Sequence, residues 1–299
     1  MIALDVGGTN MKAALVDQRC EVITARRVST GREDGPEAVV EKIVACVLDQ
    51  QSDAQRRGLA VQAGGVVVPG VVDDERGVAV FSANIGWRDV PLRERLEAAL
   101  GLPVAFGHDV RAGGLAEGRL GAARGSGDYL FLAAGTGIAA AVVLDGKPYP
   151  GHGYAGEIGH VVVDPDGPLC GCGARGCLEA IASASAISTH YAARTGTRID
   201  ALDVHARVLA GDLDARAVWD DAVAALATGL CAYANLLAPE LVVVGGGLAD
   251  AGDSLLGPLE GEIDRRLTFQ RRPKLVAAQL GDQAAALGAA LLAWQLAGT

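Results

Sequence analysis

Apolar residues recur along the chain with two different periods, which predict strands and helices. Ile2, Leu4 and Val6 alternate with other residues, and Ala13–Val16 follows as a second apolar run. A period of two is typical of β-strands, so residues 1–16 are expected to form a β-hairpin. In Pro36–Gln51 the apolar positions fall three and four residues apart, which predicts a helix with one buried face. The chain is therefore expected to be an α/β protein.

The same patterns predict the remaining elements. Strands are expected at Ala60–Val72, Val78–Phe81, Val104–Phe106, Leu241–Val244 and, in two halves, within Asp128–Leu144. Helices are expected from Asp109 to Arg119 and at Leu92–Leu100, Ile181–Tyr191, Ala201–Leu209, Ala215–Leu237, Leu255–Leu267 and Gln283–Ala297, the last capped by Asp282. We expect two α/β domains: residues 1–106, joined by a terminal helix within 282–299, and residues 107–281.

Composition narrows the class of protein. Half of the 299 residues are hydrophobic, which is enough for a sizeable core. The formal net charge of −10 argues against nucleic acid or an anionic membrane as the main partner. No apolar run reaches the roughly 20 residues that span a bilayer, and no basic segment precedes Ile2, so we expect no membrane span and no secretory signal. A reducing cytoplasm is the expected compartment, with Cys20, Cys46 and Cys231 as small buried hydrophobes.

A cluster of cysteines carries the most specific chemistry in the chain. Cys170, Cys172 and Cys177 fall within eight residues, and His160 lies ten positions before the first. Three thiolates and one imidazole form a tetrahedral zinc set with no open position, which is typical of a structural site. The alternative is a loop of reduced cysteines. A zinc loop over residues 156–179 would hold Glu157, His160 and Glu179 together, where they could bind a polyhydroxylated ligand.

Glycine turns between apolar strands are candidate phosphate sites. Gly7-Gly8-Thr9 lies in the first hairpin, and Gly135-Thr136-Gly137 repeats the arrangement about 130 residues later. Such turns can bring backbone N–H groups close to an anion, although an ordinary hairpin turn is equally consistent with either one alone. Asp5 could hold Mg²⁺ through water, or it could cap the turn. Gly245-Gly246-Gly247 follows a buried strand and could admit an adenine ring, or it could be a simple tight turn.

Two further polar residues are candidates for the chemistry. Asp109 follows a predicted strand and begins a predicted helix, so it could be a helix N-cap or a general base at the carboxyl end of the strand. Asn84 lies near Trp87 in a loop with glycine and could line a sugar pocket or simply belong to a turn.

These motifs, in this order, resemble the ROK family of bacterial sugar kinases and sugar-responsive repressors, especially its glucokinase-like members. The resemblance extends over essentially the whole chain, from Asp5–Lys12 to the terminal helix after Gly281-Asp282, and it includes Pro69-Gly70 and Asn84–Trp87. It implies an actin-like ATPase (ribonuclease H-like) fold, with two α/β domains around a cleft and a structural zinc loop. It also implies an ATP-dependent kinase for a hexose 6-hydroxyl that uses Mg²⁺, and a homodimer, since the family commonly dimerises.

The resemblance also implies a role for each motif residue. The zinc ligands are His160, Cys170, Cys172 and Cys177, and Asp109 is the catalytic base. The sugar contacts are Asn84, His108, Asp109, Glu157, His160 and Glu179. The nucleotide contacts are Asp5, Gly7, Gly8, Thr9, Lys12, Gly135, Thr136, Gly137, Gly245, Gly246 and Gly247.

One stretch departs from the family. The usual Glu-Asn-Asp-Ala-Asn around the base is replaced by Gly107-His108-Asp109-Val110-Arg111. His108 replaces an amide that both donates and accepts with a ring that, when neutral, does one at each nitrogen. Two substrates therefore remain possible. One is glucose, and the other is a 3-amino sugar such as kanosamine, whose amino group would donate a hydrogen bond to the imidazole.

Two other classes of protein were considered. A sugar-sensing regulator of this family would carry an N-terminal helix-turn-helix, for which there is no room before the hairpin at Asp5, and a non-catalytic sugar-binding protein would not need Asp109.

Overall fold

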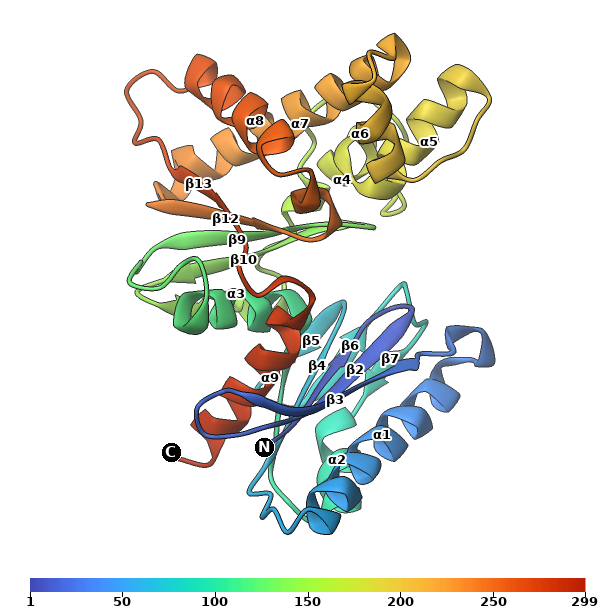
Figure 1. Ribbon diagram of the computed structural model, residues 1–299, viewed down its shortest axis with the longest axis vertical. Helices are drawn as coiled ribbons and strands as arrows, with labels where there is room; N and C mark the ends of the chain where they lie inside the picture. Colours follow the sequence, from blue (N-terminus) through green and yellow to red (C-terminus); the bar gives the residue numbers. More distant parts are fainter. Residues whose placement is uncertain (299) are drawn as a thin grey trace. The chain divides into compact units, whose positions relative to one another are not determined.

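The computed structural model describes residues 1–298, which form two compact units (Figure 1). The first unit comprises Met1–Ala116, Pro148–Ala155 and the residues from Asp282 onward. The second comprises Glu117–Lys147 and Gly156–Gly281. Each unit has its own five-stranded sheet and its own hydrophobic core.

The sheet of the first unit has the strand order β3-β2-β1-β4-β8. Its strands are β1 (Ile2–Val6), β2 (Asn10–Val16), β3 (Val22–Ser29), β4 (Gly64–Val68) and β8 (Val104–His108). β1 and β2 form the predicted hairpin, with Asp5 opposite Lys12, while β1, β4 and β8 run parallel. Parallel strands align their carboxyl ends, so the turn after β1 and the end of β8 lie at the same edge of this sheet.

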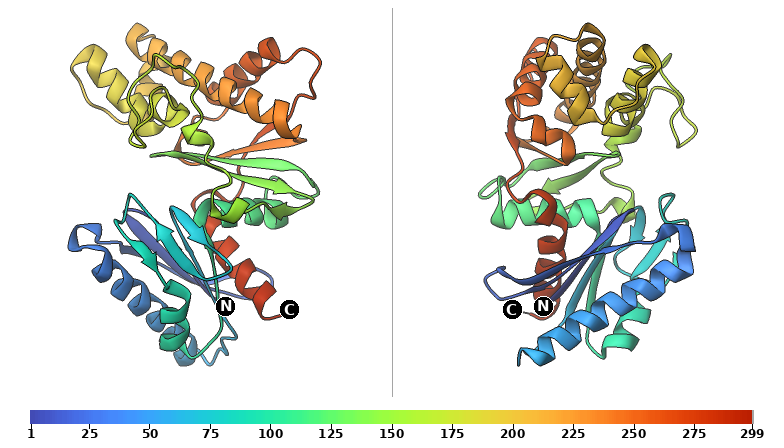
Figure 2. Two further views of the ribbon diagram at one scale, coloured as in Figure 1. Left: turned by 180° about the vertical axis from the view of Figure 1, so that it is seen from behind. Right: turned by 45° about the vertical axis from the view of Figure 1, so that its right-hand side comes forward.

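Helices cover both faces of this sheet (Figures 1 and 2). α1 (Pro36–Arg56) and α2 (Leu92–Leu100) pack on one face, and α9 (Ala284–Leu296) packs on the other. α9 comes so close that a side chain at Gly65 would overlap the carbonyl of Ala289. The views of Figure 2 agree that the N-terminus lies beside the end of α9, where Met1 and Ala293 share a small apolar cluster.

A small antiparallel sheet extends the first unit. It contains β5 (Val71–Asp73), β6 (Val78–Phe81) and β7 (Arg88–Val90), in that order. Its inward side chains, including Val72 and Ala79, join the main core of the unit. Short 3₁₀ turns lie at Arg32–Asp34, Gly151–Gly153 and Gly281–Gln283.

The sheet of the second unit has the order β11-β10-β9-β12-β13. Its strands are β9 (Tyr129–Ala134), β10 (Ile138–Leu144), β11 (Lys147–Pro148), β12 (Leu241–Gly245) and β13 (Lys274–Ala277). One face is covered by α4 (Leu178–Ala182), α5 (Ala184–Thr195), α6 (Ala201–Leu209), α7 (Leu213–Leu237) and α8 (Asp253–Arg266) (Figures 1 and 2). Two 3₁₀ turns, Ile158–His160 and Gly247–Ala251, complete it.

Several sequence-based expectations need correction. β3 was not predicted, because Val22–Ser29 is an edge strand that is mostly exposed and carries two arginines, so its pattern resembles a polar loop. β5, β7, β11 and β13 were missed or merged with neighbours because they are only two to four residues long. The helix expected at Ile181–Tyr191 is two helices separated at Ser183, whose hydroxyl caps α5 by accepting from Ala186.

The expected boundary at residues 106 and 107 is also wrong. Residues 107–116 belong to the first unit, because β8 pairs with β4 through His108 and α3 (Asp109–Leu120) begins immediately after it. The segment Pro148–Ala155 also belongs to the first unit, where Gly153 packs against the carbonyl of Val72.

Smaller details differ too. Asp282 does not cap α9, since its carboxylate pairs with Arg27 and Lys12 instead. Cys46 and Cys231 are buried as expected, but Cys20 is half-exposed in a turn with a φ of 62°. Among residues 1–298, no helix combines the length and apolar character that crossing a bilayer requires.

Candidate active site

The turn between β1 and β2 forms a tight glycine hairpin in the first unit. The N–H of Gly7 donates to the carbonyl of Asn10 at 3.0 Å, and a Cβ on Gly7 would lie only 2.7 Å from that oxygen. The buried Thr30 holds the hairpin, because its hydroxyl donates to the carbonyl of Gly7 at 2.7 Å and its N–H donates to that of Thr9 at 2.9 Å. Only glycine fits at position 7, as a backbone cradle for an anion requires.

Lys12 and Asp5 face one another beside this hairpin. The ammonium of Lys12 lies 3.8 Å from Asp5 Oδ2, and it donates to the carbonyl of Asp282 at 2.6 Å. Burial and, to a smaller extent, the charge of Asp109 raise the pKa of Asp5 to about 7 against the opposing charge of Lys12. Asp5 therefore holds its negative charge at a cost, which a bound cation would offset.

Asp109 lies where β8 ends and α3 begins. Its side chain is 22% exposed, and Oδ1 accepts from the N–H of Val110 at 2.7 Å. Burial raises the pKa of Asp109 to about 6, partly opposed by the hydrogen bond from Val110 and the charge of Arg111. A carboxyl group that ionises near neutral pH at the end of a parallel strand is suited to general base catalysis.

His108 shares the free amides at the start of α3 with Asp109. Its Nδ1 lies 3.2 Å from the N–H of Val110 and 3.4 Å from that of Arg111, and it also lies 3.3 Å from Asp109 Oδ1. Because Nδ1 accepts from these amides, the neutral ring carries its proton on Nε2. The neutral ring is then a donor at Nε2, whereas the sequence predicted an acceptor.

A partly buried ion pair supports this turn. Arg111 is 5% exposed, and its guanidinium donates to both carboxylate oxygens of Asp74 at 2.9 and 3.0 Å. Burial raises the pKa of Asp74, while Arg111 and His108 oppose the rise. Arg93 also donates to the carbonyl of Asp74. Sequence reasoning missed Asp74, because an acidic residue between two short strands resembles an ordinary turn.

Asn84 lies next to Gly8 of the first glycine hairpin. A Cβ on Gly8 would be 3.7 Å from the Cβ of Asn84, and the Asn84 side chain is exposed. The loop that carries it is anchored by Trp87, which is 1% exposed, and by a hydrogen bond from the N–H of Gly86 to the carbonyl of Ser82. Asn84 is therefore placed beside the predicted phosphate loop by a fixed backbone.

The second glycine hairpin and the later glycine turn are neighbours in the second unit. The N–H of Gly135 donates to the carbonyl of Gly137 at 2.9 Å, closing the hairpin between β9 and β10. β12 pairs with β9 in parallel, so Gly245 lies opposite Ala133. Gly246 has a φ of 80°, and a side chain there would overlap the carbonyl of Ala134. The sequence pattern did not show that these two turns are adjacent.

The four predicted zinc ligands converge. His160 Nδ1 lies 3.7 Å from Cys170 Sγ, Cys172 Sγ lies 3.7 Å from Cys177 Sγ, and one ligand atom from each residue falls within 4.8 Å of the others. A tetrahedral zinc with bonds of about 2.3 Å to sulfur needs ligand atoms roughly 3.8 Å apart, so the set fits. Burial and the neighbouring thiols raise the pKa of Cys177 to about 12, so its thiolate needs a nearby cation.

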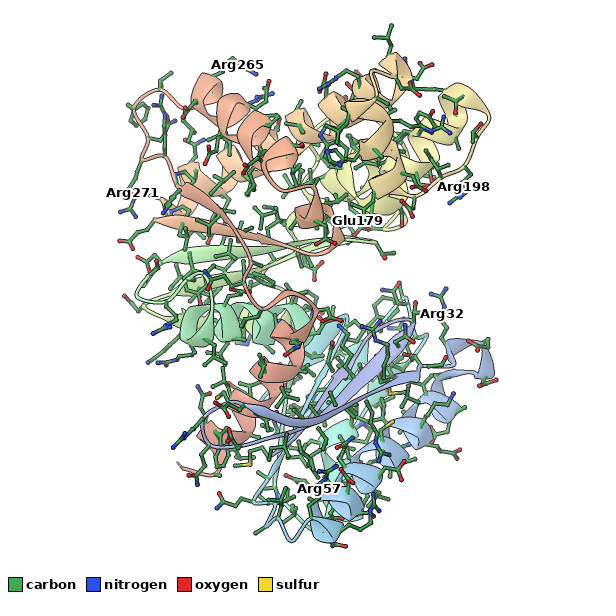
Figure 3. All side chains as sticks on the ribbon, in the orientation of Figure 1. Arg32, Arg57, Glu179, Arg198, Arg265 and Arg271 are labelled. Atoms are coloured by element: carbon green, nitrogen blue, oxygen red, sulfur yellow. The ribbon has the colours of Figure 1, made fainter. Side chains whose placement is uncertain are left out.

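The carboxylates of the zinc loop have different surroundings. Glu157 Oε2 lies 3.8 Å from His160 Nε2, the ring nitrogen that faces away from the cysteines. Both side chains are exposed, at 41% and 37%. Glu179 is half-buried, and its Oε2 accepts from the N–H of Ile138 at 2.8 Å (Figure 3).

The structure thus places the predicted residues in two groups, one in each unit. The first unit holds Asp5, Gly7, Gly8, Thr9, Lys12, Asn84, His108 and Asp109. The second holds Gly135–Gly137, Glu157, His160, Cys170, Cys172, Cys177, Glu179 and Gly245–Gly247.

Comparisons with known proteins identify the family. The model of the ROK family matches residues 1–296. The chain is 33% identical to the glucokinase of Streptomyces coelicolor, over 98% of this chain and 96% of that protein. The ROK hexokinase from Thermus thermophilus is similar with a TM-score of 0.87 and 35% identity, over 100% of this chain and 99% of that one. A ROK family glucokinase from Streptomyces griseus, solved with glucose and AMPPNP, has a TM-score of 0.85 and 32% identity, over 99% of each chain.

The two sheets, the glycine turns and the full-length similarity support one assignment. The chain has the actin-like ATPase fold of these structural neighbours. It belongs to the ROK family and resembles the family's glucokinase-like sugar kinases.

Proposed function

We propose that the protein transfers the γ-phosphoryl group of ATP to the 6-hydroxyl of a hexose or an amino hexose. The observation that carries the proposal is Asp109, a partly exposed carboxyl group at the junction of β8 and α3 whose pKa is raised to about 6. Full-length similarity to glucokinases supports the same reaction class.

Phosphoryl transfer depends mainly on positioning and charge neutralisation. In our proposal Asp109 accepts the proton of the 6-hydroxyl as that oxygen attacks the γ-phosphorus, and the bond from this phosphorus to the β-phosphate oxygen breaks to release ADP. The phosphate-binding groups of the first unit are the backbone N–H groups of Gly7–Thr9 and the ammonium of Lys12. Those of the second unit are the N–H groups of Gly135–Gly137, with Gly245–Gly247 for the adenosine. The sugar contacts of the first unit are Asn84, His108 and Asp109, and those of the second unit are Glu157, His160 and Glu179.

Two metals fit residues that are present. Mg²⁺ bound through Asp5 would neutralise phosphate charge, and the raised pKa of Asp5 is consistent with a carboxylate that a cation stabilises. Zinc on His160, Cys170, Cys172 and Cys177 would have a structural role, since four protein ligands leave no open position.

The pKa of Asp109 predicts the acid side of the pH profile. A general base must be ionised, so kcat/KM should fall as the pH drops through about 6 and the carboxylate of the free protein is protonated. An unshifted aspartate would lose activity only near pH 4. The measurement is kcat/KM for the sugar from pH 3.5 to 8 by ADP release, with the coupling enzymes in excess at each pH. A midpoint near 4 would show that burial does not raise this pKa.

The surroundings of His108 bear on the choice of sugar. With its proton on Nε2, the ring can donate to a hydroxyl or to an unprotonated amine, but not to an ammonium group. The carboxylates of Asp74 and Asp109 beside the ring would instead attract an ammonium group. We therefore propose that the substrate is glucose or a 3-amino sugar such as kanosamine, with His108 selecting between them.

A panel of sugars tests both the reaction class and this selection. ATP consumption should be measured with glucose, 3-amino-3-deoxyglucose, mannose and N-acetylmannosamine, for the wild type and His108→Asn. If His108 favours the amino sugar, the wild type should have a kcat/KM for 3-amino-3-deoxyglucose that at least equals its kcat/KM for glucose. His108→Asn should shift the ratio of these two kcat/KM values about tenfold toward glucose, as expected for one altered hydrogen bond. A wild type that prefers glucose and a ratio unmoved in His108→Asn would contradict the selection. Sugar binding without any ATP consumption would reject the kinase.

A further inference from the structure

Glu179 connects the zinc loop to the second glycine hairpin. It is the second residue after the last zinc ligand, Cys177, and it lies in the first turn of α4. Its carboxylate turns toward the end of the sheet, where Oε2 accepts from the N–H of Ile138 at 2.8 Å (Figure 3). Ile138 is the first residue of β10 and directly follows Gly135–Gly137.

The hairpin sequence leaves room for this carboxylate. A Cβ on Gly137 would lie 2.5 Å from Glu179 Oε2, so any side chain at position 137 would displace the carboxylate. Glycine at this position therefore does two things: it shapes the turn, and it admits Glu179 to the backbone beside it.

The other end of the hairpin is held from the same segment. The N–H of Ala184 donates to the carbonyl of Gly135 at 2.8 Å. Ala184 is two residues after the end of α4. Glu179, within this helix, and Ala184, just beyond it, therefore make hydrogen bonds at the two ends of the glycine hairpin. The carboxylate of Glu157, also in the zinc loop, lies beside the His160 ring instead.

We propose that Glu179 is a positioning residue for the nucleotide as well as a sugar contact. Oε2 holds the second phosphate hairpin in its binding shape, and Oε1 remains for the sugar. A sugar that fixes this carboxylate also fixes the hairpin, so sugar binding strengthens nucleotide binding, and by linkage the reverse holds equally. This inference rests on the proposed kinase function.

Two substitutions at Glu179 separate its two roles. Glu179→Gln keeps one oxygen that can accept from Ile138 and replaces the other with an NH₂ group. Glu179→Ala removes both. Affinity for MgAMPPNP without sugar should therefore stay within twofold of the wild type in Glu179→Gln and fall roughly tenfold in Glu179→Ala, as expected for loss of a hydrogen bond to a charged acceptor. Calorimetry measures both.

The matched control is Glu157→Ala, which removes a carboxylate from the same loop without a recorded bond to the hairpin. It should weaken glucose binding and leave the affinity for MgAMPPNP unchanged. Adding glucose should tighten MgAMPPNP binding in the wild type, and this effect should disappear in Glu179→Gln. Zinc content and circular dichroism of each variant establish that the loop is folded.

Amide hydrogen exchange tests the link independently of any binding. The N–H of Ile138 should exchange slowly in the wild type and in Glu179→Gln, and at least tenfold faster in Glu179→Ala. Equal MgAMPPNP affinity in the wild type and Glu179→Ala, or unchanged exchange at Ile138, would overturn the positioning role. A wild type that binds no nucleotide but shows the exchange difference would reject the kinase proposal while retaining the structural link.

Discussion

Asp109→Asn is expected to lower kcat about a thousandfold, within the range that general base catalysis contributes. Asparagine has nearly the same shape and can still hydrogen-bond a sugar hydroxyl, but it cannot take a proton from it. The hydrogen bond from Val110 to Oδ1 of Asp109 can be kept by the amide oxygen of asparagine, so the start of α3 should stay intact. Sugar affinity should therefore change by less than about tenfold. Steady-state kinetics and sugar titration measure the two effects.

The matched control for this substitution is Asp49→Asn. Asp49 is an exposed residue of α1 in the same unit, and its change should leave kcat unaltered. Turnover by Asp109→Asn within a factor of ten of the wild type would falsify the assignment of the base. Loss of sugar binding together with turnover would point instead to a folding defect, which a melting curve would reveal.

Loss of zinc is expected to have the second-largest effect. Residues 161–176 form no regular helix or strand. Two isolated bridges, Val162–Cys177 and Leu169–Arg175, and turn hydrogen bonds such as that from Cys170 to Ala174 hold the loop. A metal bound by His160 and the three cysteines would add to these bonds, because zinc binding contributes directly to folding at such sites. Cys172→Ser, or chelation of the wild type, should weaken sugar affinity at least tenfold and lower the melting temperature.

The control for the cysteine substitution is Cys20→Ser, which changes a half-exposed cysteine in a turn of the first unit. It should retain one zinc per chain, sugar affinity and melting temperature. Adding zinc to the chelated wild type should restore sugar binding, while Cys172→Ser should not recover. Sugar affinity that survives complete removal of zinc would show that the metal does not organise Glu157, His160 and Glu179.

The hydrophobic pattern was sufficient where an element is long and has one buried face. α2 and α6 have the predicted bounds, Leu92–Leu100 and Ala201–Leu209, because their apolar spacing changes abruptly at both ends. α1 extends five residues beyond its predicted end, through Arg56, because Ala54 is the only apolar residue among these five and gives too weak a signal. The hydrophobic pattern did not predict β3, because most of its residues face solvent and it pairs with β2 through backbone hydrogen bonds.

In the candidate site, too, the sequence predicted local features but not contacts between residues far apart in the chain. Glycine turns and clustered cysteines can be recognised locally, because close backbone approach and metal coordination demand particular residue types at short spacing. Thr30 and Asp74 were missed, since each acts on a partner more than twenty residues away. Glu117 is a clear case: it lies in an ordinary helical stretch, yet its buried carboxylate accepts from the N–H groups of Ala122, Gln279 and Leu280.

The sequence by itself therefore determined the family, the alternation of strands and helices, the two glycine hairpins and the four residues of the histidine–cysteine cluster. The tertiary structure alone decided that His108 accepts the first amides of α3, that Arg111 pairs with Asp74, and that Glu179 reaches Ile138. The physical reason is that propensity, turn chemistry and metal coordination depend on neighbours within a few residues. The partner of a carboxylate or an imidazole depends on which distant backbone groups the fold leaves unpaired beside it.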